Sequence, residues 1–155
     1  MSTITDYTDA EWQTLTDAIA MVWVTVSTAD MNLISLFNET KAAIQYMEEG
    51  KKTYQNSLLI LNLITTVLDG KMQPPNEKLK TVDEFVTKAE AKLHEAIAIL
   101  KVKATPEEMT DFQNFAYGVG ERVANAFGTG VFGKGEKVTE KEAEVLAKLK
   151  AALEM

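Results

Sequence analysis

The chain has no cysteine and a single histidine among its 155 residues. Without cysteine it can form no disulfide, no thiolate nucleophile and no thiolate ligand for zinc or an iron–sulfur cluster. The lone His94 excludes histidine triads, and a di-iron helical bundle would need two Glu-x-x-His pairs that are absent here. The few serines stand outside any Gly-x-Ser-x-Gly motif. The sequence therefore predicts that the protein is not an enzyme.

Positive charge is scarce, with 16 Lys and Arg against 23 Asp and Glu, which gives a net charge of −7. Proteins bind nucleic acids largely by neutralising phosphates with basic side chains, so we expect no nucleic-acid partner. The acidity is explained by solubility, or by attraction of cations or basic protein partners.

Long hydrophobic runs are also missing. The longest predominantly apolar stretch, Ala18 to Val26, spans nine residues, whereas a spanning helix needs about 20. Residues 1–9 are polar and acidic, unlike a secretory signal. The sequence predicts no transmembrane segment and a cytoplasmic location, and it leaves peripheral membrane association open.

The overall composition is that of a folded globular protein. Hydrophobic residues make up 46% of the chain and charged residues 25%. A chain of this length can bury a sizeable core without disulfides or metals. We expect a single domain over residues 1–155.

Four Thr-x-x-Glu motifs occur along the chain, each followed by apolar residues at helical spacing. Such a motif is typical of a capping box, in which threonine and glutamate satisfy N–H groups that have no partner within the helix. The four motifs are Thr8/Glu11, Thr81/Glu84, Thr105/Glu108 and Thr139/Glu142. They predict an all-α protein.

The apolar spacing divides the chain into helices joined by polar, Gly- or Pro-containing links. The expected helices cover residues 9–29, 35–49, 53–68, 82–101, 106–127 and 140–153. Ser35 is expected to cap the second helix and Gly50 to end it. The third is apolar around its circumference and should be central and buried. We predict a bundle of about six or seven helices, with helix–loop–helix units in both halves.

Small residues recur at four-residue steps in the fifth predicted helix, at Ala116, Gly120 and Ala124. Because glycine within a helix costs about 1 kcal/mol relative to alanine, Gly118 and Gly120 indicate close packing against another helix. The row also offers a contact surface for a protein partner.

The segment Gly128 to Gly133 has the letters of a dinucleotide-binding motif. That motif needs a strand before the loop and a helix immediately after it, pointing its N–H groups at phosphate. Here a helix precedes the loop, and the next helix starts only after Thr139. We interpret the segment as a connection between helices.

Oxygen-bearing side chains gather near the first helix–helix connection, at Asp30, Asn32 and Glu39. Hard divalent cations such as calcium bind ligands of this kind. The same residues are equally explained without a metal, with Asn32 forming a turn and the two acids lying near helix ends. The spacing does not match an EF-hand loop.

Several motifs together resemble the TerB-like group of bacterial tellurite-resistance proteins. In the C-terminal half they are Thr105-Pro-Glu-Glu, Phe112-Gln-Asn-Phe-Ala, Val123-Ala-Asn-Ala-Phe-Gly, Gly130-Val-Phe-Gly-Lys-Gly, Lys137-Val-Thr-Glu-Lys-Glu and Leu146-Ala-Lys-Leu-Lys-Ala-Ala-Leu. Near the N-terminus, Val26-Ser-Thr-Ala-Asp30, Ile34-Ser35 and Glu39 are similar to the family's Ala-Asp-Gly-x-Ile-Ser-x-x-Glu segment. Met31 replaces the usual glycine, and the segment is longer here.

The resemblance implies an all-helical domain involved in stress or metal resistance, with Asp30 and Glu39 as metal ligands. We therefore expect a non-enzymatic helical binding or scaffold module that binds a divalent cation. The alternative is a structural or protein-interaction domain without metal, which would use the methionines and the small-residue row for contacts.

Overall fold

The computed structural model describes residues 2–29, 33–70, 79–126 and 138–155. Within these ranges it contains six α-helices, one short 3₁₀ helix and no strand, which confirms the predicted all-α bundle. The elements are η1 (Ile4–Asp6), α1 (Asp9–Ala29), α2 (Leu33–Thr53), α3 (Leu58–Leu68), α4 (Val82–Lys103), α5 (Pro106–Ala126) and α6 (Glu140–Ala152).

All four predicted capping boxes form, at the starts of α1, α4, α5 and α6. In each box the threonine N–H donates to the glutamate carboxylate at 2.8–3.0 Å. The glutamate N–H donates in return to the threonine hydroxyl at 3.2 Å. A fifth box, Thr3 with Asp6, precedes η1. The four predicted boxes explain why α1, α4, α5 and α6 begin where the sequence predicted.

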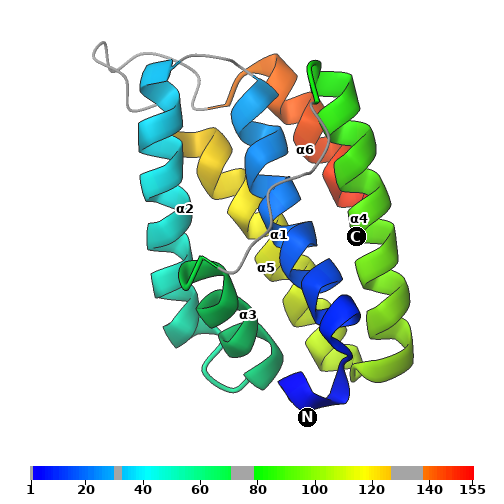
Figure 1. Ribbon diagram of the computed structural model, residues 1–155. Coiled ribbons are helices and arrows are strands. Elements are labelled where there is room, and N and C mark those ends of the chain that lie inside the picture. Colours follow the sequence, from blue (N-terminus) through cyan, green and yellow to red (C-terminus); the bar gives the residue numbers. More distant parts are fainter. Residues whose placement is uncertain (1, 30–32, 71–78, 127–137) are drawn as a thin grey trace.

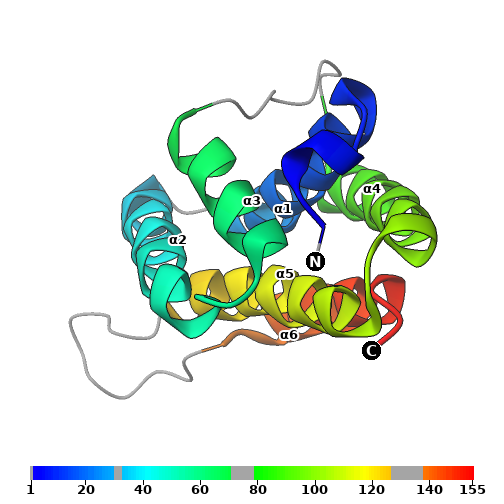
Figure 2. The ribbon, with the colours of Figure 1, turned by 90° about the horizontal axis from the view of Figure 1, so that it is seen from below.

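Helix α1, like α5, contacts each of the other five α-helices, and it lies at the centre of the bundle. In Figure 1 α1 runs between α2 and α4 with α5 behind it, and the end view in Figure 2 shows the same arrangement.

Two buried threonines on α1 donate their hydroxyl hydrogens to backbone carbonyls. Thr16 donates to Trp12 at 2.9 Å, and Thr25 donates to Phe85 on α4 at 3.3 Å. These bonds let polar residues lie inside the core.

The prediction that the third helix is the central one is wrong. Helix α3 packs against α1, α2 and α5 but leaves Leu58 40% exposed and Thr65 on the surface. An apolar circumference shows that a helix has several neighbours, but it does not show which helix has the most. None of the described helices is long and hydrophobic enough to span a bilayer.

The predicted bounds of the second and third helices are also wrong. Helix α2 already includes Ser35, and it continues through Gly50 to Thr53. Gly50 is buried inside the helix, where an added Cβ would lie 3.1 Å from Ile64 Cδ1 on α3. This glycine therefore permits a close approach of helices and does not end one. Helix α3 starts later than predicted, after Ser57.

The small residues of α5 pack closely against neighbouring helices, as predicted. A Cβ at Gly120 would lie 3.1 Å from Val22 Cγ1 on α1 and 3.0 Å from Leu146 Cδ2 on α6. At Gly118 a Cβ would clash with Tyr46 Oη on α2 and would lie 2.6 Å from Tyr46 Cζ. Glycine is thus required at the seam between α2 and α5.

Replacing Gly118 with alanine tests this seam. The substitution should lower the free energy of unfolding by about 1–2 kcal/mol, because displacing Tyr46 costs more than the gain in helix propensity. Urea unfolding followed by circular dichroism measures the change. The Asn114→Ala variant is the matched control, since Asn114 is exposed one turn earlier on the same helix. In a Tyr46→Leu background the cost of Gly118→Ala should shrink, and an unchanged cost would contradict the steric explanation.

Candidate functional site

Of the three predicted metal ligands, Glu39 lies in the second turn of α2. Asp30 and Asn32 fall outside the described residues. Glu39, on α2, is described and is only 1% exposed. Among the described residues there is no group of three or more His, Cys, Asp or Glu that could hold a metal ion. The proposed ligand set is therefore represented in the structure by Glu39 alone.

Glu39 is one of three buried glutamates in the described chain, together with Glu108 (5% exposed) and Glu142 (1% exposed). The sequence indicated Glu108 and Glu142 only as capping residues. Nothing in the local sequence separates them from Glu11 and Glu84, whose boxes have the same spacing. Their burial depends on helices that are distant in the sequence, so the sequence alone could not predict it.

The charge of Glu108 is stabilised by hydrogen bonds. Burial alone would raise its pKa, but the N–H groups of Thr105 and Ser2 and the Ser2 hydroxyl donate to its carboxylate and hold the pKa below its usual value. The carboxylate therefore remains ionised at neutral pH. Ser2 lies in the segment before α1, so this contact joins parts of the chain 106 residues apart.

A cluster of aromatic and charged side chains joins α2 to α5. The rings of Tyr46 and Tyr54 each lie 5.7 Å from the ring of Phe115, between centroids. The Arg122 guanidinium lies 5.5 Å from the Tyr46 ring centroid and forms an ion pair with Glu49. Burial, followed by the neighbouring Tyr54, raises the pKa of Tyr46 well above its usual range. The sequence analysis missed this cluster because its members come from distant helices.

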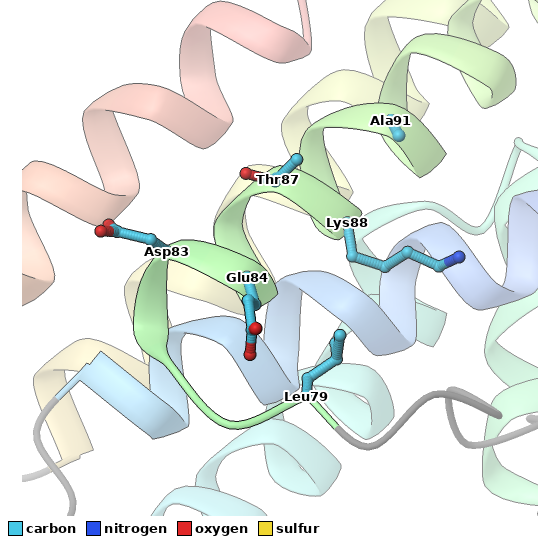
Figure 3. A pocket seen from close by; sticks show the side chains of 6 residues that line it. All are labelled: Leu79, Asp83, Glu84, Thr87, Lys88 and Ala91. Carbon is cyan, nitrogen blue, oxygen red and sulfur yellow. The ribbon is translucent and has the colours of Figure 1, made fainter.

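A shallow groove of about 460 Å³ runs along the N-terminal half of α4. Figure 3 shows its lining side chains, and they fan out from the helix without converging on one point. Asp83 points toward α6, whereas Lys88 extends in the opposite direction. Glu84 is already engaged, because it accepts from the N–H groups of Lys80 and Thr81 at 2.6 and 3.0 Å. The groove therefore offers no set of groups aimed at a common ligand atom.

A second depression, of about 230 Å³, lies between α4 and α6 beside the last residue of α1. Ala29, Val86 and Val145 contribute apolar surface to its lining. Charged side chains also line it, among them Lys148 and Glu144, which pair with each other at 3.2 Å. Its volume is below the range of typical drug-sized ligand sites.

The remaining sequence motifs add no further group to a site. His94 lies on the exposed surface of α4. The segment Gly128 to Gly133 falls outside the described residues. No family model, curated protein or solved structure matches the chain. The resemblance to TerB-like proteins therefore stays a prediction that rests on the motifs themselves.

The buried tyrosines predict a loss of stability in alkali. Burial raises the pKa values of all four tyrosines, Tyr46 furthest. The unfolded chain therefore releases protons first, and stability should be constant between neutral pH and about pH 10 and fall as the pH rises further. Urea unfolding at several alkaline pH values, with tyrosinate absorbance of the folded protein, measures this effect. A Tyr46→Phe variant should lose less stability over that range, and a loss equal to wild type would contradict the assignment.

Proposed function

We propose that the protein is a non-enzymatic helical binding or scaffold module, resembling the TerB-like tellurite- or stress-resistance proteins. We further propose that it binds a divalent cation such as calcium weakly through Asp30, Asn32 and Glu39. The observation that supports the cation site most directly is the burial of Glu39, which is 1% exposed.

Carboxylate and amide oxygens are the ligands that hard divalent cations bind, and Asp30, Asn32 and Glu39 carry oxygens of these two kinds. Glu39 lies in the second turn of α2, nine residues after Asp30 in the sequence, and α1 ends at Ala29, directly before Asp30. The three proposed ligands thus fall within ten residues of the sequence.

The resemblance gains support from a parallel between the two halves of the chain. The motifs of the resemblance include an Ile-Ser segment followed by Glu39 in the first half and a Val-Thr segment followed by Glu142 in the second half. Both glutamates are 1% exposed, and each lies within the first two turns of its helix, α2 or α6. A glutamate buried near a helix start therefore recurs in both halves.

A binding role is favoured over catalysis by the residues available for chemistry. The sequence has no cysteine, and its single histidine lies exposed on α4. The acids that line the α4 groove either cap the helix or point away from their neighbours (Figure 3). We find no general acid and nucleophile arranged around a shared space in the described residues.

Isothermal titration calorimetry with calcium, magnesium and zinc tests the cation site. We expect saturable heat with calcium for the wild-type protein, weakened at least tenfold in an Asp30→Ala/Glu39→Ala double variant. Because Glu39 is buried, an Asp30→Asn variant is included to remove one ligand charge without emptying space in the core. Asp9→Ala is the matched control, since Asp9 is an exposed acid at the other end of α1. Equal heats from wild type and the Asp30 variants would remove the site.

The alternative function is a structural or protein-interaction domain without metal. Several of the residues that the sequence suggested for its contact surface are buried. The small-residue row is internal, because Ala116 and Ala124 are 0% exposed. Met21 and Met47 are buried in the core as well, at 4% and 0% exposure. Absence of any cation-dependent heat in the wild-type protein would favour this alternative, with contacts made by other residues.

A further inference from the structure

The segment of residues 2–7, here called the latch, folds over the end of the bundle where α4 turns into α5. It consists of the one-turn helix η1 and its flanking residues, and its backbone bonds to itself through Asp6 N–H to Thr3 and Tyr7 N–H to Ile4, at 3.0 and 3.3 Å. In Figures 1 and 2 it lies against the ends of α4 and α5 and extends α1.

Glu108 is the principal polar attachment of the latch to the bundle. Its Oε1 accepts from the backbone N–H of Ser2 at 2.6 Å and from the Ser2 hydroxyl at 2.8 Å. Its Oε2 accepts from the Thr105 N–H at 2.9 Å, which caps α5. One ionised carboxylate therefore serves a helix start on one side and the latch on the other. Hydrogen bonds to an ionised acceptor are stronger than those to a neutral one.

Tyr7 is the apolar attachment of the latch. Its side chain is 6% exposed, its ring centroid lies 5.7 Å from that of Trp12, and its hydroxyl donates to Ser2 Oγ at 3.2 Å. The Lys103 ammonium lies 5.6 Å from the centre of the same ring. The position of Tyr7 is thus linked through Ser2 to Glu108.

Other charges surround this end of the bundle. From α4, Lys103 Nζ donates to the Asp6 carbonyl at 3.0 Å and pairs with Glu11 of α1 at 2.6 Å. The Asp6 carboxylate faces its own segment and accepts from the Thr3 N–H. Tyr7 and the amino-terminal ammonium group are further titratable groups that act on Glu108 or feel its charge. Lys103 is already neutralised by Glu11, so Glu108 is the acid whose charge acts directly on Ser2.

We propose that Glu108 holds the latch closed through its negative charge, and that neutralising this carboxylate releases residues 2–7 together while the described helices of the bundle stay folded. Release moves Tyr7 away from Trp12 and uncovers the apolar end of the bundle between α1 and the α4–α5 turn. The latch is separable because its internal bonds are local, whereas the helices it covers are held by their own packing against α1.

Amide hydrogen exchange in a Glu108→Gln variant tests the proposal. Glutamine keeps the size of the side chain but removes the charge and places an NH₂ group among donors. Exchange of the Asp6 and Tyr7 amides should accelerate roughly 10- to 100-fold, because a single helical turn does not keep its own hydrogen bonds once it has left the bundle, and the size of the change is that of losing a hydrogen bond to a charged group. The amides of Leu63 and Val119 in the core should exchange as slowly as in wild type.

Two further variants keep the test decisive. Glu84→Gln is the matched control, because Glu84 forms the same capping box at an exposed helix start far from the latch. It should leave the Asp6 and Tyr7 amides unchanged. Ser2→Ala removes a latch donor without touching the cap of α5, and it should accelerate the same two amides. The proposal is overturned if Glu108→Gln affects the latch no more than Glu84→Gln does, or if it accelerates latch and core amides equally.

Acid should release the latch in the wild-type protein. Backbone donors hold the pKa values of Glu108 and Glu84 below normal, and pairing with Lys103 lowers that of Glu11. A depressed pKa contributes stability above the unfolded value near 4.5, and this stability is lost as the pH falls through the folded value. Trp12 fluorescence in a Trp23→Phe variant should change in acid before helix content declines. Simultaneous loss of both signals would overturn separate release.

Discussion

The burial of α1 is the constraint on which the rest of the structure depends. Five helices contact this one helix, so their backbones must come close to it and to one another. Small side chains make this possible, since Ala18 on α1 is 0% exposed and Gly120 on α5 lies against Val22. Where the large side chain of Tyr46 on α2 packs against α5, the residue opposite it on α5 is Gly118. The core is thus shaped by matched pairs of small and large residues from different helices.

Helix starts impose a second requirement, because their first N–H groups need partners wherever the end of a helix is covered. The Thr–Glu boxes meet it with side chains that already belong to the helix. At α5 the same glutamate also accepts from Ser2, so one ionised group stabilises both a helix start and a contact between distant segments. This double use explains how a carboxylate that is only 5% exposed retains its charge.

The sequence predicted those features that depend on residues three or four positions apart. The four boxes and the starts of α1, α4, α5 and α6 are of this kind. It could not predict which helix is central, because α3 is more apolar along its length than α1 but has fewer neighbours. Gly50 is suited equally to ending a helix and to packing inside one, and only its contact with Ile64 decides between the two. Of the proposed metal ligands, the structure describes only Glu39, and its burial depends on packing that the sequence does not reveal.

The central claim is that one core organised around α1 holds all six helices together as a cooperative unit. Urea unfolding followed by NMR at Leu63 of α3 and Leu149 of α6 tests it most directly, since these buried residues belong to helices at opposite ends of the bundle (Figure 1). The account predicts the same transition midpoint at both positions, coincident with the loss of helix content. Separate midpoints for α3 and α6 would contradict a shared core.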